Sequence, residues 1–145
     1  MADKIVLSCP TAPKAVGPYS HVVKVGNMLY LSGQIPLDPK TGQLTDPDIS
    51  GQTRQALKNL KAILEFAGGG THSVVKTTVY LTTLLDFDMM NEVYEEFFNF
   101  EPPARTTVEV AALPKGALVE IDAIAVLPAS IMEKATASTP FGSGL

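Results

Sequence analysis

The sequence has little of what several protein classes need, and each shortage narrows the possibilities. There is one cysteine, Cys9, so no disulfide can form within the chain, which fits a reducing compartment. The two histidines, His21 and His72, are far apart and have no cysteine or carboxylate at ligand spacing, so we expect no metal site. No apolar run could span a bilayer, and the N-terminus lacks the long apolar stretch of a signal peptide. We expect a cytoplasmic protein, with a mitochondrial pool left open.

Positive charge is also scarce. Lysine and arginine together number 11 against 15 aspartates and glutamates, which gives a formal net charge of −4 at pH 7. The cations are scattered along the chain and form no basic run. Nucleic-acid binders usually carry a basic face, because neutralising phosphates supplies most of their non-specific affinity. The composition therefore argues against RNA or DNA as the main partner.

The length and apolar content indicate one globular domain. The chain has 145 residues, of which 46% are hydrophobic and 18% charged. This length is common for one domain, and so low a charged fraction in a small domain suggests that another subunit covers part of its apolar surface. We assign a single domain to residues 1–128 and a polar C-terminal tail to residues 129–145.

Apolar periodicity predicts the order β-β-α-β-α-β-β, with a short additional strand expected at residues 4–9. A hairpin is expected around Gly26-Asn27, and residues 36–48 form a loop. Helical spacing predicts a helix over about residues 49–67, which ends at the glycines Gly68 to Gly70. A strand is predicted to follow at residues 73–81. A second helix is predicted to begin at a cap residue, Asp86 or Asp88, and the helical region ends before Pro102-Pro103. Its predicted core stripe is Met89, Met90, Val93, Tyr94, Phe97 and Phe98.

Two final strands, residues 105–113 and 117–127, are predicted to form a hairpin around the turn Pro114-Lys115-Gly116. Two helices can cover only one face of such an α/β (α+β) sheet, yet the strands are apolar on both faces. In the last strand Val119, Ile121, Ala123 and Ala125 face one way, and Leu118, Ile124 and Val126 the other. We therefore predict a closed homo-oligomer in which a neighbouring subunit covers the second face.

Arg105 and Glu120 are unexpected in these final strands. Burying either charge is costly unless it is paired and hydrogen-bonded. One interpretation makes Glu120 a strand residue at a subunit boundary, satisfied by a neighbour's backbone or by Arg105. The other makes Arg105 an anion receptor and Glu120 a proton-transferring group, because arginine grips a carboxylate with two hydrogen bonds and a carboxylate at an interface can have a raised pKa. In that case the two groups meet where two protomers touch.

Four other positions have both a structural and a functional interpretation. Tyr19, in Gly-Pro-Tyr-Ser, either packs a turn or hangs its hydroxyl over a cleft. Ser32 and Gly33, at the end of a strand, either serve the turn or let a ligand approach the backbone. Asn91 lies off the apolar stripe and reaches a cleft or water. No Gly-x-Ser-x-Gly motif is present, and Cys9 is expected to be buried rather than reactive.

Several segments together resemble the RidA family of reactive intermediate deaminases, also called the YjgF family. They are GPYS, LYLSGQIPLDPKTGQL, QALKNLKAIL, VVKTTVYL, NEVYEEFF and PPARTTVEVAALPKGALVEIDAIAV, spanning about residues 12–126. The resemblance implies a chorismate-mutase-like homotrimer with a central barrel, helices outside and ligand clefts between subunits. It also implies cofactor-free hydrolysis of enamines and imines, released by pyridoxal-phosphate enzymes, to 2-keto acids and ammonia.

The same resemblance implies a role for each candidate residue. Arg105 would hold the substrate carboxylate, and Glu120 would deprotonate the attacking water and return the proton to the leaving nitrogen. Tyr19 and Ser32 would close the cleft, the backbone amides of Gly33 and Thr107 would bind substrate oxygens, and Asn91 would line the wall. Many relatives have cysteine where this chain has Thr107. The alternatives are an endoribonuclease or translation inhibitor, and a non-catalytic binder of small carboxylates or chaperone.

Overall fold

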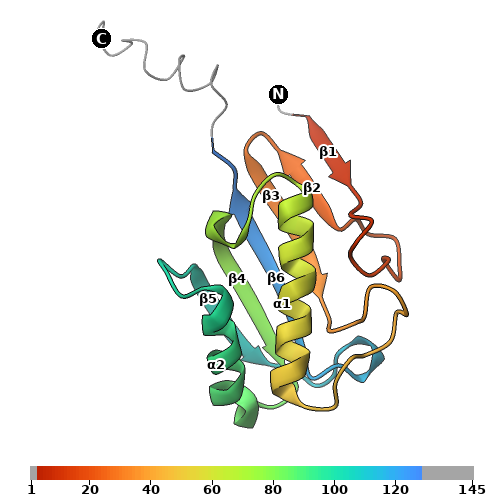
Figure 1. Cartoon of the computed structure of the whole chain (residues 1–145), viewed down its shortest axis with the longest axis vertical. Helices are drawn as coiled ribbons and strands as arrows, with labels where there is room; N and C mark the ends of the chain where they lie inside the picture. The colour runs from red at the N-terminus through yellow and green to blue at the C-terminus, as the bar shows by residue number, and fades with distance from the viewer. Residues whose placement is uncertain (1–2, 129–145) are drawn as a thin grey trace, which may run out of the picture.

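The computed structural model describes residues 3–128, which form one sheet with two α-helices packed against it (Figure 1). This is the mixed α+β class that the sequence predicts. The predicted tail, residues 129–145, lies outside the described residues. The strands are β1 (Lys4–Leu7), β2 (Val22–Val25), β3 (Met28–Gln34), β4 (Val74–Leu81), β5 (Ala104–Glu109) and β6 (Val119–Val126). The helices are α1 (Ile49–Phe66) and α2 (Phe87–Phe97), with short 3-10 turns η1 (Thr71–Ser73), η2 (Leu84–Asp86) and η3 (Pro114–Gly116).

The strand order across the sheet is β1-β2-β3-β6-β4-β5. The predicted hairpin at Gly26-Asn27 is present, because β2 and β3 pair in antiparallel register with Val25 opposite Met28. Gly26 has a φ of +59°, the left-handed conformation that favours glycine in such a turn. The loop after β3 is confirmed as well, apart from one bridge between Leu37 and Leu44.

The predicted hairpin between the last two strands is wrong. β4 lies between them, pairing in antiparallel register with β6 and in parallel with β5. The turn at Lys115 and Gly116, both with positive φ, resembles a hairpin turn, but it belongs to a connection that crosses the end of β4. Strand pairing is decided here by the crossover through α2, which returns the chain parallel to β4 on its outer side. β5 is therefore an edge strand.

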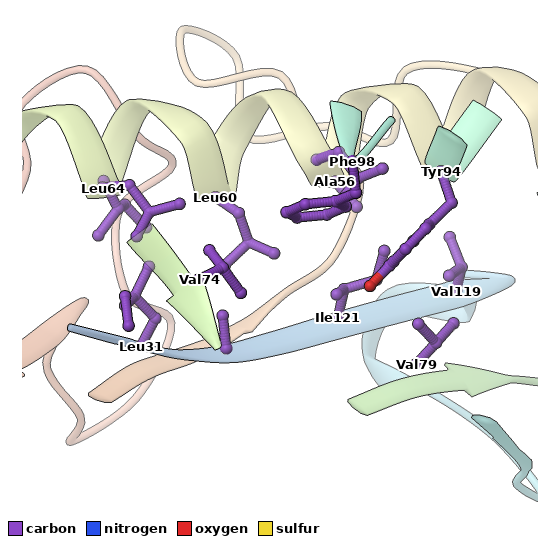
Figure 2. Close-up of a cluster of buried hydrophobic side chains, with 14 of the residues drawn as sticks. Leu31, Ala56, Leu60, Leu64, Val74, Val79, Tyr94, Phe98, Val119 and Ile121 are labelled. Atoms are coloured by element: carbon purple, nitrogen blue, oxygen red, sulfur yellow. The ribbon is translucent and has the colours of Figure 1, made fainter. Parts of the chain in front are cut away.

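Both helices pack on one face of the sheet, as predicted (Figure 1). The core lies between α1 and the central strands, with Leu60 and Leu64 of the helix above Leu31, Val74 and Ile121 (Figure 2). Of the predicted α2 stripe, Met90, Val93 and Tyr94 are buried with Phe98, but Met89 is 50% exposed. One residue turns the helix by about 100°, so Met89 points away from the sheet although Met90 points into it. Cys9 is buried, as expected.

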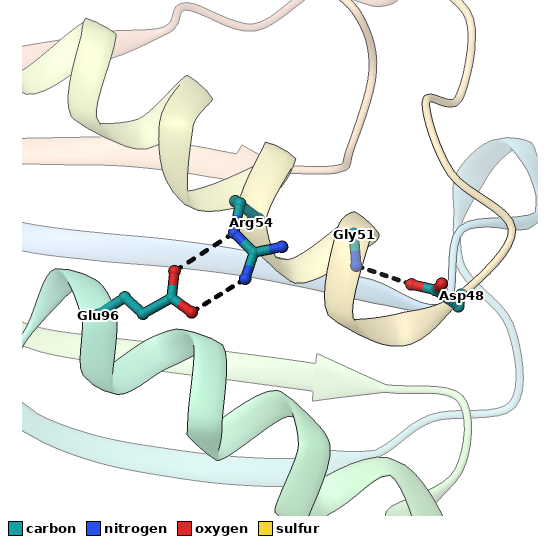
Figure 3. Close-up of polar contacts among 4 residues, drawn as sticks. All are labelled: Asp48, Gly51, Arg54 and Glu96. Carbon is teal, nitrogen blue, oxygen red and sulfur yellow. Dashed lines mark hydrogen bonds and ion pairs between the residues drawn. The ribbon is translucent and has the colours of Figure 1, made fainter.

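Helix ends and one ion pair fix the two helices to their surroundings. Asp48, the N-cap residue of α1, accepts a hydrogen bond from the Gly51 amide at 2.8 Å (Figure 3). Arg54 of α1 holds Glu96 of α2 at 2.9 Å, and this is the one ion pair within residues 3–128 (Figure 3). Asp86 occupies the N-cap position of α2, one of the two predicted, but its side chain makes no capping hydrogen bond.

Neither α1 nor α2 packs on the second face of the sheet (Figure 1). On β6 the predicted alternation is confirmed: Val119, Ile121, Ala123 and Ala125 are buried against the helices. Glu120, Asp122, Ile124 and Val126 therefore lie on the other face, which we call the open face. Apolar side chains remain on it, since Tyr30 of β3 is 45% exposed and Val126 is 38% exposed. The open face is thus partly apolar and partly acidic.

Candidate functional site

Arg105 lies on edge strand β5 and points to the helix side of the sheet. It pairs with Thr77 of β4, whose hydroxyl faces α2 and lies 2.7 Å from the Tyr94 hydroxyl. The Arg105 guanidinium carbon lies 4.7 Å from the centre of the Tyr94 ring and 5.6 Å from that of Phe87. Both distances are within the range in which an aromatic face attracts a cation. Two aromatic side chains of α2 therefore hold the guanidinium in place.

No hydrogen bond or ion pair reaches the Arg105 side chain from residues 3–128, whose single ion pair uses the other arginine, Arg54. Aromatic contacts leave the in-plane N–H donors of a guanidinium available, because the ring meets its flat face. Arg105 thus presents its hydrogen-bonding edge to a ligand. This is the arrangement expected of a carboxylate receptor rather than of a structural ion pair.

Tyr94 is buried beneath Arg105 and is itself fixed by the hydrogen bond to Thr77. Burial raises the pKa of the Tyr94 phenol, while the hydrogen bond to Thr77 and the nearby charge of Arg105 oppose that rise. The phenol therefore stays neutral at physiological pH, and its ring supports the guanidinium without adding charge to the site.

A cavity of about 480 Å³ opens beside the guanidinium. Asn91 lines it, and the Asn91 Oδ1 atom is buried without a hydrogen-bond partner in the described structure. An orphaned buried acceptor is costly unless a ligand or water supplies a donor. The remaining lining residues are Glu92, Tyr94, Glu95, Phe98, Pro102, Pro103 and Arg105. Asn91 and Arg105 therefore line the same cavity.

Thr107 lies two residues beyond Arg105 on β5, so its side chain points to the same side of the sheet. It lines a second hollow, of about 490 Å³, together with Phe87, Asp88 and two exposed leucines of η2. Phe87 contacts the guanidinium and also lines this hollow. Arg105, Asn91 and Thr107 thus form one group, the arginine half-site, along the outer edge of β5.

Glu120 lies on the open face, in a different environment. It is half-buried, and no residue within 3–128 donates a hydrogen bond to its carboxylate. Burial raises the pKa of Glu120, and the negative charge of Asp122, two residues along the same face, raises it further. Asp122 is itself held by the Tyr80 hydroxyl and the Thr78 amide, each at 3.1 Å. Glu120 is therefore the carboxylate of this pair that is free to exchange protons.

Gly33 lies against the Glu120 carboxylate at a bulge in β3. The pairing of β3 with β6 is regular up to Leu31 and resumes at Gln34 with a shifted register. A β-carbon on Gly33 would overlap the Glu120 carboxylate, so the two lie in direct contact. The Ser32 hydroxyl donates to the Ser20 carbonyl, which ties the bulge to the Gly-Pro-Tyr-Ser segment.

Tyr19 directly precedes Ser20, and its side chain is 46% exposed. Its hydroxyl accepts a hydrogen bond from the Val16 amide at 3.1 Å and keeps its own proton available to a ligand. Ser32, Gly33 and Glu120 thus lie together, with Tyr19 joined to them through Ser20. We call these four residues the glutamate half-site.

The two half-sites lie on opposite faces of the sheet. Arg105 pairs with Thr77, which faces the helices, whereas Glu120 pairs with Tyr80, three residues further along β4. Because successive strand residues alternate between faces, this odd separation places the two charges on opposite sides. Arg105 therefore does not satisfy Glu120 within one protomer, which overturns that part of the structural interpretation. The expected meeting across two protomers stays a prediction.

Four residues with evident parts in these half-sites were missed by the sequence analysis. Phe87 was not singled out, and Tyr94 was assigned only to the core. Periodicity shows which face of a helix is buried, but it does not show that a guanidinium contacts the aromatic ring of Tyr94. Asp122 and Tyr80 were not proposed either. The alternation Glu-Ile-Asp on one strand was visible in the sequence and places the two carboxylates on one face.

Within the described part of the chain, no group of three or more histidine, cysteine, aspartate or glutamate side chains is arranged to hold a metal ion. No helix in residues 3–128 combines the length and apolar character needed to cross a membrane.

Replacing Gly33 with alanine should lower any activity that depends on Glu120 while leaving the fold intact. The added methyl would lie 2.9 Å from Glu120 Cδ and 3.0 Å from Cγ, so the carboxylate has to move away. That side chain is half-exposed and can move without disturbing the core. Gly26→Ala is the control: it forces positive φ on alanine but meets nothing within 4 Å. Comparable activity losses in both variants at equal thermal stability would contradict the specific contact.

Comparison with known proteins gives consistent matches over most of the chain. The family model described as Endoribonuclease L-PSP matches residues 9–127. A RutC family protein of Pyrococcus horikoshii is 55% identical over 122 residues, covering 84% of this chain and 97% of the relative. A mouse protein named 2-iminobutanoate/2-iminopropanoate deaminase is 50% identical over 121 residues, covering 83% and 90%. The crystal structure of E. coli TdcF with bound serine matches with a TM-score of 0.82 at 42% identity, covering 86% and 99%.

Proposed function

The chain belongs to the L-PSP endoribonuclease family, in which the RidA (YjgF) proteins are found, and we propose that it is an imine deaminase. Its substrates would be 2-iminobutanoate, 2-iminopropanoate and their enamine tautomers, released by pyridoxal-phosphate enzymes, and its products 2-keto acids and ammonia. The observation that carries this proposal is the pair of uncompensated charges: a guanidinium fixed by two rings and a carboxylate with a raised pKa.

We further propose that the protein is a homotrimer whose sites lie between protomers. Each protomer presents its arginine half-site at the outer edge of β5 and its glutamate half-site on the open face. A neighbouring chain that covers the partly apolar open face could bring its β5 edge to Glu120. This assembly would pair each guanidinium with a carboxylate of another chain. It would also bury Tyr30 and Val126, which a solitary protomer exposes.

The substrate carboxylate would be held by Arg105 through two parallel hydrogen bonds. Binding of serine by TdcF, a relative at 42% identity, supports a receptor for a small molecule with a carboxylate. Asn91 would accept a hydrogen bond from the substrate nitrogen through its unpartnered Oδ1 atom. The backbone amides of Thr107 and Gly33, and the hydroxyls of Tyr19 and Ser32, would surround the remaining polar atoms.

Hydrolysis would proceed by addition and elimination. A water molecule attacks the imine carbon while Glu120 takes one of its protons, forming a C–O bond and leaving a tetrahedral carbinolamine. Glu120 returns this proton to the imine nitrogen, which completes the neutral carbinolamine. It then carries the proton of the carbinolamine hydroxyl to the amino nitrogen, the C–N bond breaks with its electron pair leaving on ammonia, and the O–H electron pair becomes the second bond of the new carbonyl. Free imines hydrolyse in water without help, so orientation and proton transfer at one carboxylate supply enough acceleration. The scheme needs no cofactor.

A coupled assay tests the proposed activity. A dehydratase generates 2-aminoacrylate from serine, and the decay of this intermediate is followed spectroscopically with and without the protein. We expect faster decay with stoichiometric release of pyruvate and ammonia. Unchanged decay would contradict the deaminase, and Arg105-dependent cleavage of a single-stranded RNA in its place would indicate the endoribonuclease alternative.

Replacing Asp122 with asparagine should shift the acidic limb of the pH–activity profile to lower pH. As the base, Glu120 must be ionised, so activity rises as pH passes upward through its pKa. That pKa is raised by burial and by the charge of Asp122; removing the charge lowers it and extends activity towards acid. Asparagine can still accept from the Thr78 amide through Oδ1, so the packing is conserved.

The control for this variant is Glu65→Gln, which removes one negative charge from an exposed position of α1 that lines neither half-site. It should leave the acidic limb where it is. A limb that stays in place in Asp122→Asn, or moves equally in both variants, would show that Asp122 does not set the protonation of Glu120.

A further inference from the structure

A third cavity lies where three loops meet. It has a volume of about 240 Å³, and three lysines line it: Lys14 before β2, Lys40 in the loop between β3 and α1, and Lys115 in η3. The other lining residues are Pro13, Ala15, Val16, Leu37, Pro39, Thr41 and Gly42. Neither Arg105 nor Glu120 lines the cavity, so its charged groups are separate from those of the proposed deaminase site.

The charge balance of this cavity is unusual for the chain. Acidic residues outnumber basic ones by 15 to 11, yet three of those 11 cations line one cavity and no aspartate or glutamate does. Within residues 3–128 the single ion pair is Arg54–Glu96, so none of the three ammonium groups has a carboxylate within 4.0 Å. A concave surface with charge of one sign concentrates its counter-ions. The missing counter-charge therefore points to an anionic ligand.

The loops that carry the lysines are held in position by local hydrogen bonds. Asp38, beside the cavity lining, uses its carboxylate to accept from the Lys40 amide at 2.7 Å and the Thr41 amide at 3.2 Å. The Lys115 Nζ atom donates to the Gly42 carbonyl at 3.3 Å, joining η3 to the β3–α1 loop. Gly42 in turn donates its amide to the Asp38 carbonyl at 2.8 Å. The wall is thus arranged before any ligand arrives.

We propose that this cavity binds a small molecule through its phosphate group. Three lysines from three different loops suit the nearly spherical charge of a phosphate, whereas a planar carboxylate is better matched by the fork of an arginine. The volume lies below the range of drug-sized pockets and fits a phosphate with a short organic group. A nucleic-acid strand needs an extended basic face or stripe, whereas these three lysines line a single small cavity.

A bound phosphate would also contact the chain segment that carries Tyr19. Val16 lines the cavity, and its amide donates to the Tyr19 hydroxyl. Lys14, Ala15 and Val16 all belong to this segment, so a ligand that pairs with Lys14 reduces the freedom of the tyrosine five residues further on. The segment from Lys14 to Tyr19 therefore connects the lysine cavity to the glutamate half-site, although no charged residue belongs to both.

The test is a titration of the intact protein with inorganic phosphate, followed through the backbone amide signals of Thr41 and Gly42 in a two-dimensional NMR spectrum. Sodium chloride at matched ionic strength is the reference. We expect saturable shifts with phosphate and none with chloride. The triple variant Lys14→Gln, Lys40→Gln, Lys115→Gln should weaken binding roughly tenfold or more, because each lost ammonium removes a charge-assisted contact.

The matched control is Lys58→Gln with Lys61→Gln, which removes two exposed lysines from α1 and should leave phosphate affinity within about twofold. If the triple variant does not fold, Lys14→Gln and Lys40→Gln are measured singly and should each weaken binding. Equal affinity in the lysine variants, or shifts no larger than those with chloride, would overturn the proposal. A short single-stranded RNA that binds more tightly than glycerol phosphate through the same lysines would also overturn it.

Discussion

Arg105→Ala should lower kcat/KM for a freshly generated 2-imino acid by roughly 100- to 10,000-fold, because two charge-assisted hydrogen bonds to the substrate carboxylate are lost. The guanidinium is held by Phe87 and Tyr94 and makes no ion pair in the described structure, so its removal breaks no salt bridge. The cation–π contacts with these two rings disappear from the fold, and each such contact contributes about 1 kcal/mol at partly exposed sites. Activity should therefore collapse while thermal stability and oligomer mass stay close to those of the wild type.

The chain offers a matched control, since it has only two arginines. Arg54→Ala breaks the exposed pair with Glu96 on the outer surface and should leave turnover unchanged. Arg105→Lys keeps the charge without the planar fork and should fall between alanine and the wild type. Full turnover in Arg105→Ala would show that the guanidinium does not anchor the substrate.

Glu120→Gln should reduce kcat by roughly 100- to 10,000-fold, the range over which a positioned acid–base group accelerates proton transfer. Glutamine has nearly the same shape and can occupy the space beside Gly33, but it cannot take a proton from water. Because the carboxylate accepts no hydrogen bond within residues 3–128, the substitution leaves no buried donor unsatisfied there. Substrate affinity, carried by Arg105, should change little.

Glu109→Gln is the control for that variant. Glu109 lies on β5 and accepts from the Leu84 amide at 2.8 Å, so it is an exposed strand carboxylate with a structural partner. Its replacement should leave kcat unchanged. If Glu120→Gln lost only affinity, or if both glutamine variants lost turnover equally, proton transfer at Glu120 would be the wrong assignment and a non-catalytic binder of small carboxylates would fit better.

Elements set by local sequence were predicted well. The spacing of Leu57, Leu60 and Leu64 predicts α1, and the structure ends it one residue from the expected position. Alternation in β6 predicts which of its side chains are buried, because the period of a strand depends only on its own residues. The bulge at Ser32 and Gly33 was anticipated only as an exposed strand end beside a loop.

Features that depend on which strands are neighbours were not predictable in this way. The turn at Lys115 and Gly116 suggested a hairpin, but β4 occupies the place between β5 and β6, and no local signal marks that order. Without the register, alternation could not show that Arg105 and Glu120 face opposite sides. Tyr94 was assigned to the core correctly. The Arg105 guanidinium lies above its ring because β5 pairs in parallel with β4, and this pairing was not predicted.

The most direct test of a site shared between two chains is complementation between two inactive variants. Arg105→Ala and Glu120→Gln chains carrying different affinity tags are unfolded, mixed in equal amounts, refolded and purified through both tags. Neither chain alone holds both intact groups, but a site between chains can take its arginine from one and its glutamate from the other. Each mixed homotrimer has one interface of three that combines the intact arginine with the intact glutamate, so imine hydrolysis should return to about one third of the wild-type rate per site. Mixed oligomers as inactive as their parents would contradict the account.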